Sequence, residues 1–171
     1  KVAEIARAFL VQDSAMARRI TRATDPLPSA GLPFRVPSAD ELPTRVDGAL
    51  TVLYLIFNEG YLSSGTGADP IRRDLTVEAI RLARLIRSLL PNDGEIAGLL
   101  ALMLLTEARS AARMSAGGEL VTIDEQDRSG WDQAMIAEGH RLVRERLASG
   151  TAPGRYQLLA AISAVHTSAR D

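Results

Sequence analysis

The sequence predicts an all-α protein: a partial helix-turn-helix followed by an antiparallel helical bundle or TPR-like helical array. Aromatic residues make up only 4% of the 171 residues, whereas Ala, Leu and Arg are abundant, and this bias favours helices over sheets. Apolar residues recur at steps of three and four, and proline and glycine collect between these periodic stretches. The pattern also leaves room for one small β-hairpin.

Two short helices are predicted at the start of the chain. The first is indicated by an apolar stripe of Val2, Ile5, Ala6 and Phe9. The second is indicated by Met16, Ile20 and Ala23, with Asp13 or Ser14 as its N-cap. Their separation matches a helix-turn-helix, in which the second helix lies in the major groove of DNA.

A proline-rich linker is predicted over residues 25–37, which hold four of the eight prolines together with Gly31. We therefore divide the chain into residues 1–24, the second half of a helix-turn-helix; residues 25–37, the linker; and residues 38–171, a helical extension.

Five helices are expected in the extension. The first begins at the capping-box pattern Ser38-Ala39-Asp40-Glu41, buries Leu42, Val46, Leu50, Leu53 and Phe57, and stops at Asn58-Glu59-Gly60, with Gly60 left-handed. The second opens at Asp69-Pro70, ends at Pro91, and buries Leu75, Ala79, Leu82, Ile86 and Leu89 opposite Arg81, Arg84 and Arg87. The third is strongly apolar and should be central, with Ile96, Leu99, Leu100, Met103 and Leu104.

The helical periodicity of apolar residues is interrupted at "ARMSAGGELVTI", and a small β-hairpin can form there. A fourth helix follows, capped by Ser129, with Trp131, Met135, Leu142, Val143 and Leu147 buried. The fifth buries Tyr156, Leu159, Ala160, Ile162 and Val165. Because most connections are short, successive helices should pack as antiparallel neighbours.

Charge is distributed unevenly along the chain. The first 24 residues carry five basic side chains against two acidic ones, a net +3, so the remainder carries −4 of the overall −1. A local positive charge on a short helix is what phosphate contacts require, whereas the acidic remainder argues against DNA wrapped over the whole surface. Arg18, Arg19 and Arg22 lie outside the apolar stripe and can face DNA.

Several functional classes find no support in the composition. The chain has no cysteine and two distant histidines, so we expect no metal site and no cofactor, and no triad or phosphate-binding loop indicates an enzyme. No apolar run reaches the roughly 18 residues of a membrane-spanning helix, and no signal peptide is evident. A cytoplasmic protein fits this composition.

Two polar stretches of the extension allow either a functional or a structural interpretation. A ligand or partner niche could gather Tyr54, Asn58, Glu59, Arg128, Trp131 and His166. Alternatively, "FNEGY" is a helix end, the acidic residues of "DEQDRSGWD" complement a helix dipole, and His166 is a core histidine. The structural interpretation needs no ligand, and residue types alone favour it.

Taken together, "VAEIARAFLVQDSAMARRITRA", "GLPFRVP", "LYLIFNEGY", "LLALMLL", "DEQDRSGWD" and "YQLLAAISAVH" resemble one family. The chain is similar to bacterial extracytoplasmic-function (ECF) sigma factors of the subgroup with a large helical, TPR-like C-terminal extension. The resemblance covers nearly the whole chain, and "LYLIFNEGY" with "DEQDRSGWD" makes it specific. It implies that the first segment is the second half of the region 4 helix-turn-helix, which binds the promoter −35 element.

The resemblance also implies residue roles and partners. Contacts to bases and phosphates would come from Ser14, Ala15, Arg18, Arg19 and Arg22, since arginine can bind guanine or phosphate bidentately. Where related chains continue with a basic run, this one has Thr24-Asp25-Pro26-Leu27, so part of the phosphate contact is missing. RNA polymerase core would be bound by regions upstream of Lys1.

The chain is expected to be a fragment, because it begins at Lys1 and its last helical pattern runs to the end. Exposed Ile5, Phe9 and Met16 would then permit dimerisation of the fragment. The extension would regulate the factor or bind a partner, through a protein or an intramolecular contact. The alternative is a stand-alone ligand- or peptide-binding helical module that gates a transcription regulator.

Overall fold

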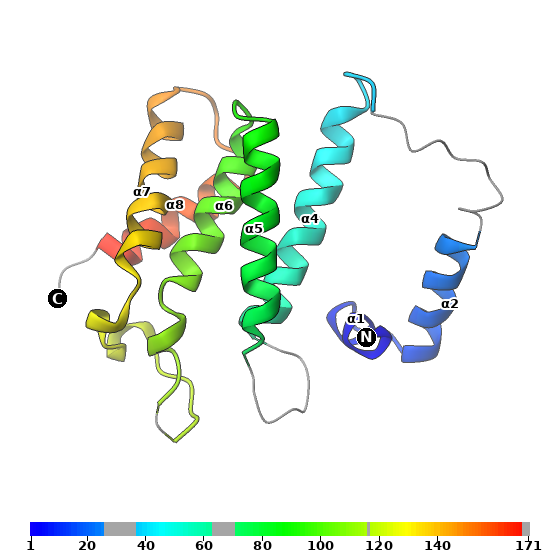
Figure 1. Ribbon diagram of the computed structural model, residues 1–171, viewed down its shortest axis with the longest axis horizontal. Coiled ribbons are helices and arrows are strands. Elements are labelled where there is room, and N and C mark those ends of the chain that lie inside the picture. Colours follow the sequence, from blue (N-terminus) through cyan, green and yellow to red (C-terminus); the bar gives the residue numbers. More distant parts are fainter. Residues whose placement is uncertain (26–36, 63–70, 116, 169–171) are drawn as a thin grey trace. The chain divides into compact units, whose positions relative to one another are not determined.

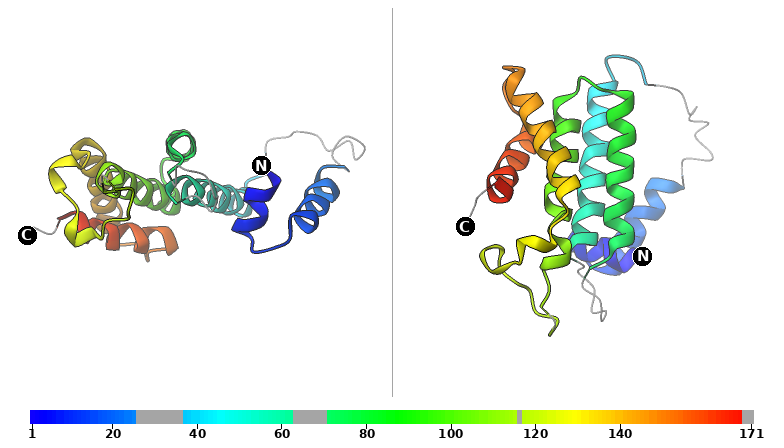
Figure 2. Two further views of the ribbon diagram at one scale, coloured as in Figure 1. Left: turned by 90° about the horizontal axis from the view of Figure 1, so that it is seen from below. Right: turned by 60° about the vertical axis from the view of Figure 1, so that its left-hand side comes forward.

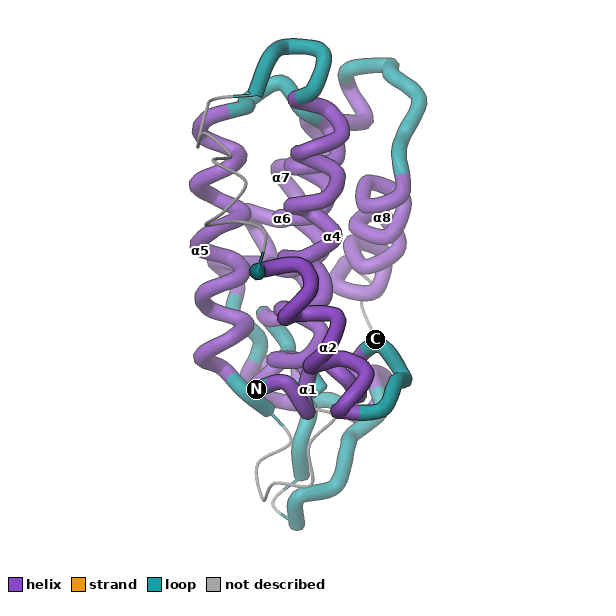
Figure 3. The backbone as a smooth tube through the Cα atoms, turned by 90° about the vertical axis from the view of Figure 1, so that its right-hand side faces the viewer, coloured by secondary structure: helices purple, strands orange, loops and turns teal. Residues whose placement is uncertain are grey.

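The structure, a computed structural model, describes residues 1–25, 37–62, 71–115 and 117–168. All regular elements in these ranges are helices, so the all-α prediction is confirmed (Figure 3). The chain forms two compact units, Lys1–Arg72 and Arg73–Asp171, which are described in turn. Residues 26–36, most of the predicted linker, and Asp69-Pro70, the predicted opening of a helix, lie outside the described residues.

The first unit begins with two short helices, α1 (Val2–Ala8) and α2 (Asp13–Thr24), which contact each other (Figure 1). The chain reverses between them through Leu10, whose φ of 53° is left-handed, and the Val11 N–H donates to the Ala6 carbonyl at 2.9 Å. Ala6 and Met16 are buried, whereas Ala23 of the predicted stripe is exposed. The N-cap of α2 is Gln12 and makes no side-chain bond, so the prediction of Asp13 or Ser14 as cap is wrong.

The first unit continues with α4 (Leu42–Tyr61). Its start keeps half of the predicted capping box, because the Glu41 carboxylate accepts bonds from the N–H and the hydroxyl of Ser38, at 3.1 and 3.0 Å. The prediction of a left-handed Gly60 is wrong: Gly60 lies inside the last turn with a helical backbone, and the helix ends one residue later at Tyr61, with Leu62 as its C-cap. The Gly60 carbonyl accepts a hydrogen bond from the Arg72 N–H at 2.8 Å, so this carbonyl of the last turn has a partner outside the helix.

Four helices build the second unit: α5 (Arg73–Leu89), α6 (Gly94–Glu107), α7 (Gln133–Ala148) and α8 (Arg155–Ser168). Helix α6 contacts the other three, and α8 lies across one face of α6 and α7 (Figure 2). Every residue from Ile96 to Leu105 is buried, as expected of a helix that is apolar all round. The prediction that this helix is central is confirmed.

Helix α5 buries a face that overlaps the predicted one at Ala79, while Leu75, Leu82 and Ile86 are only half-buried. Thr76, Ala79, Ile80 and Ala83 are buried, whereas Leu89 is 70% exposed. Two arginines expected to face solvent instead contact α7: Arg84 pairs with Glu138 at 2.6 Å, and Arg87 with Glu145 at 3.3 Å. Helix α5 is thus rotated about its axis relative to the predicted stripe, and Arg84 and Arg87 connect it to α7.

Short 3₁₀ turns connect α6 to α7, at Ser110–Ala112, Ile123–Glu125 and Arg128–Gly130. In place of the β-hairpin that the sequence allows, the structure has one antiparallel bridge, between Met114 and Leu120. Gly118, with φ 81°, lies in the turn between these two residues. No strand forms within the described ranges, because Ile123 enters a 3₁₀ turn instead of extending the pairing.

The last two helices depart from prediction at the cap of α7, at Leu147 of α7, which is 70% exposed, and at one face of α8. Asp132 caps α7 by accepting bonds from the N–H groups of Ala134 and Met135, both at 2.9 Å, so the prediction of Ser129 is wrong. Helix α8 buries Tyr156, Ala160 and Ala164 and leaves Ile162 and Val165 57% and 68% exposed. Apart from Tyr156, the buried residues of α8 are small, which suits a close crossing of α6.

Candidate functional site

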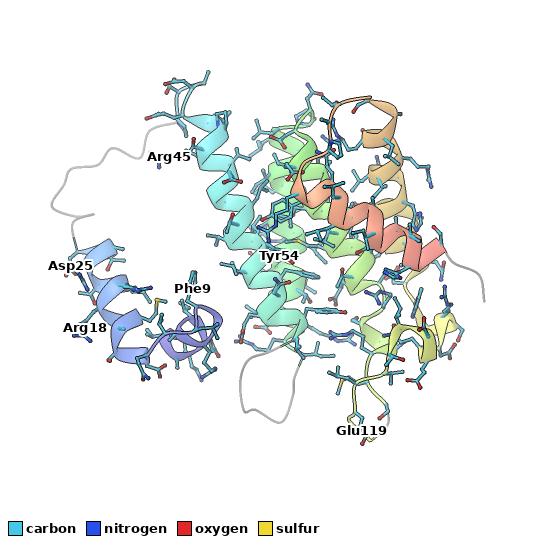
Figure 4. All side chains as sticks on the ribbon, turned by 180° about the vertical axis from the view of Figure 1, so that it is seen from behind. Phe9, Arg18, Asp25, Arg45, Tyr54 and Glu119 are labelled. Atoms are coloured by element: carbon cyan, nitrogen blue, oxygen red, sulfur yellow. The ribbon has the colours of Figure 1, made fainter. Side chains whose placement is uncertain are left out.

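The predicted DNA-reading residues lie together on α2. Arg18, Arg19 and Arg22 are exposed, as is Ser14, while Ala15 is half-buried. Figure 4 shows Arg18 extending away from α1, so its guanidinium is turned to solvent rather than into the pair of helices. The structure therefore brings these five residues onto one short, accessible helix that is the second of two joined by a tight turn.

The contacts of these arginines are weak and local. The Arg18 Nε donates to the Ser14 carbonyl at 3.2 Å, and the Arg22 Nε donates to the Arg18 carbonyl at 3.4 Å. Neither arginine is in an ion pair within the part of the chain that the structure describes. Their charges are thus available to an anionic partner, and a phosphate oxygen would form shorter, charge-assisted bonds than these carbonyls do.

The helix pair also contacts the end of its own unit. The Arg72 guanidinium lies 3.1 Å from the Glu4 carboxylate of α1. This pairing occupies the acidic residue of α1, so the positive charge of α2 has few acidic neighbours in the pair: Asp13 in its first turn and Asp25 after its end.

The predicted niche divides between the two units, so its two halves are described separately. Tyr54, Asn58 and Glu59 lie on α4 and are half-buried (Figure 4 labels Tyr54). On the same helix the rings of Phe57 and Tyr61 stack with their centroids 6.0 Å apart. This stacking accounts for two aromatic residues of "LYLIFNEGY" by packing alone.

The second half of the niche lies in the segment before α7. The Arg128 guanidinium sits over the Trp131 ring, 4.8 Å from its centroid, and Trp131 is 5% exposed. Asp127 accepts a bond from the Ser129 N–H at 2.9 Å, and its bonds with Ser129 lower the pKa of the Asp127 carboxyl. Together with the Asp132 cap, these contacts give "DEQDRSGWD" a structural role. His166 is exposed on α8, so its interpretation as a core histidine is wrong.

A buried polar cluster that the sequence analysis missed lies where α6 ends: Thr76, Glu107, Ser110, Arg113 and Gln126 are all buried. Burial raises the pKa of Glu107, against the lowering effects of hydrogen bonds with Thr76 and Ser110 and of the charges of Arg73 and Arg113. The Glu107 Oε2, the Gln126 Oε1 and the Trp131 Nε1 are buried without a hydrogen-bond partner. The one feature of the sequence that could have indicated this cluster is Glu107 itself, a carboxylate at the end of an otherwise apolar helix.

A cavity lies between α6, α7 and α8, and its lining includes Arg146 and Gln157. The described residues contain no group of three or more acidic or histidine side chains that could hold a metal ion. None of the described helices has the length and apolarity to cross a membrane. The second unit therefore offers two buried features, one polar and one mainly apolar.

Comparison with known proteins adds a family. A family model described as a family of unknown function (DUF6596) matches residues 45–147. The chain belongs to the DUF6596 family. An uncharacterized protein of Rhizobium meliloti (strain 1021) is 44% identical over 168 residues, which are 98% of this chain and 39% of the relative. This chain thus spans about two fifths of the length of that relative. No solved structure matches the chain.

The DUF6596 match runs from Arg45 in α4 to Leu147 in α7. The matched range includes the segments "LYLIFNEGY" and "DEQDRSGWD", the buried cluster around Glu107, and Arg146. It leaves out α1, α2 and α8, although the rhizobial relative aligns over nearly the whole chain. The arginines of α2 therefore lie outside the DUF6596 segment, and the polar features of the second unit lie within it.

Proposed function

We propose that this chain contributes promoter recognition to an ECF-type sigma factor: α1 and α2 are the second half of its region 4 helix-turn-helix, and the DUF6596 segment belongs to a regulatory helical extension. The observation that carries the proposal is the exposed arginine face of α2, the second helix of a pair joined by a tight turn. Recognition helices of this motif contact base edges with their N-terminal residues.

The mechanism follows from the placement of these side chains. Ser14 and Ala15 occupy the first turn of α2, where a helix end points into the major groove, while Arg18, Arg19 and Arg22 follow along the helix. Arginine can bind guanine N7 and O6 with two hydrogen bonds or bind a phosphate. In this proposal the −35 element of the promoter is the DNA partner, and the cytoplasmic parent protein acts without a cofactor.

RNA polymerase core would be the obligate protein partner, bound by parts of the parent protein outside this chain. The rhizobial relative has three fifths of its length outside the aligned region, which is compatible with further regions of this kind. The extension would modulate the factor by binding a partner or a ligand. The alternative, a ligand-binding helical module that gates a regulator, is favoured by one observation, the cavity beside Arg146.

The test uses the intact parent protein with RNA polymerase core and a promoter that depends on its −35 element. Because Arg18 and Arg19 are exposed, Arg18→Ala with Arg19→Ala should leave the circular dichroism spectrum unchanged and reduce transcription at least tenfold. The control, Arg45→Ala with Arg144→Ala, removes the same charge from exposed positions on α4 and α7. Unchanged transcription in the Arg18/Arg19 variant, or equal losses in the two variants, would contradict the proposal.

A further inference from the structure

The cavity between α6, α7 and α8 has a volume of about 110 Å³. It forms because the facing helices carry short side chains there: Ala97 and Ala101 on α6, and Ala160 and Ala161 on α8. Leu142 closes its inner wall on α7 and is 2% exposed. The inner part of the cavity is therefore lined by apolar side chains, which can contact a small apolar group.

The cavity opens to solvent. Leu147 and Leu158 line it and are 70% and 53% exposed, so apolar side chains surround its mouth. Thr151 and Pro153, in the connection between α7 and α8, complete the rim. A ligand could therefore enter without rearrangement of the three helices.

Arg146 places a positive charge at this mouth. Its Nε donates to the Gln157 Oε1 and its Nη2 to the Thr151 Oγ1, both at the long distance of 3.4 Å. It forms no ion pair within the described ranges, in contrast to Arg84 and Arg87 of the same unit. The remaining guanidinium N–H groups have the fork geometry that matches a carboxylate.

The neighbouring acidic residue, Glu95, forms no ion pair with Arg146 in the part of the chain that the structure describes. The Glu95 carboxylate accepts bonds from the Tyr156 and Gln157 N–H groups and from the Gln157 Nε2, so it serves the start of α8. Arg146 also lies in the last turn of α7, where a positive charge complements the helix dipole. That role explains the charge, but it does not require an open apolar cavity beside it.

We propose that this cavity binds a small monocarboxylate with a branched apolar tail. The carboxylate would pair with Arg146, with the Thr151 hydroxyl beside it, and the tail would contact Ala101 and Leu142. A cavity of about 150 Å³ takes benzene, so the present one fits a tail of about four or five carbons. The site is separate from the DNA-reading helix, and its test does not depend on DNA binding or transcription.

The experiment is calorimetric titration of the full chain with 4-methylpentanoate. Two probes separate head from tail: 4-methylpentan-1-ol keeps the tail without the charge, and acetate keeps the charge without the tail. Both should bind at least tenfold more weakly than 4-methylpentanoate. Equal affinity of the alcohol, or no heat of binding with 4-methylpentanoate at millimolar concentration, would overturn the proposal.

Variants locate the site. Arg146→Gln should weaken binding about tenfold or more, as expected when a charge-assisted pair is lost, whereas Arg144→Gln, an exposed arginine on the same helix that does not line the cavity, should bind normally. If circular dichroism shows that Arg146→Gln does not fold, Ala161→Phe replaces it as the test variant. Ala161 is half-exposed at the rim, so a phenyl ring there can fill the cavity and should prevent binding. Normal binding in either folded variant contradicts the proposal, as does tighter binding of N-acetyl-Ala-Leu, which would indicate a peptide C-terminus as the occupant.

Discussion

Glu95 of α6 caps the start of α8 from a different helix: its carboxylate accepts a hydrogen bond from the Tyr156 N–H at 3.0 Å and one from the Gln157 N–H at 3.3 Å. The first N–H groups of a helix have no partner within the helix itself. A negative charge there also complements the positive end of the helix dipole. The packing of α6 against α8 is thus fixed by a polar contact as well as by apolar burial.

We expect Glu95→Ala to lower the free energy of unfolding of the chain by about 1–2 kcal/mol, because two backbone donors lose their acceptor. Glu95→Gln keeps one acceptor oxygen and should cost less. Urea unfolding followed by circular dichroism measures both, with Glu119→Ala as a control at an exposed position outside the helices. An equal loss in Glu95→Ala and Glu119→Ala would show that the cap contributes nothing.

Helices α6 and α8 approach each other closely at Gly98. A Cβ atom at this position would lie 2.5 Å from the backbone nitrogen of Gln157, and backbone cannot move aside as a flexible side chain can. Gly98→Ala should therefore lower the free energy of unfolding by about 2 kcal/mol or more. Gly48→Ala, in an exposed part of α4 with nothing within 4 Å, should instead raise it by about 0.5–1 kcal/mol. Thermal and urea unfolding of the two variants should thus shift in opposite directions; shifts of the same sign would contradict the close approach.

The extent to which the sequence predicts this fold depends on how local each signal is. Helix α6 was predictable because an uninterrupted apolar run from Ile96 to Leu105, flanked by Glu95 and Glu107, needs no knowledge of its neighbours. The buried face of α8 was predicted only in part, because it depends on how α8 packs against α6. Tyr156 and Ala160 are buried as expected, whereas Ile162 and Val165 are exposed. The cap of α7 was missed since Ser129 and Asp132 are equally good caps in sequence, and only the three-dimensional course of the chain selects one.

The candidate sites show the same contrast. The exposure of Arg18, Arg19 and Arg22 could be predicted from helical spacing and charge, and the structure places all three at the surface of α2. The cavity beside Arg146 could not, because its walls come from three helices, and its alanines and leucines do not differ in sequence from ordinary core residues. The burial of Glu107 depends likewise on α5 and on the segment after α6.

Glu107 makes the stability of the chain depend on pH in a specific direction. Because burial raises the pKa of Glu107 in the folded state, the folded chain retains a proton that the unfolded chain has already lost. Stability contributed by this group is therefore lost as the pH rises above the ordinary value of 4.5 and through the folded-state pKa. Glu107→Gln cannot ionise, so its free energy of unfolding relative to the wild type should increase with pH over this window.

Urea unfolding at a series of pH values from 4 to 8 tests this expectation, with Glu119→Gln as an exposed control that should follow the wild type. Thr76→Val sharpens the test, because the hydrogen bond with Thr76 lowers the pKa of Glu107. Without that bond the pKa should rise further, and the loss of stability should extend to higher pH. Parallel pH profiles of the free energy of unfolding for the wild type and Glu107→Gln would contradict this expectation. They would mean that the pKa of Glu107 is the same in the folded and the unfolded chain.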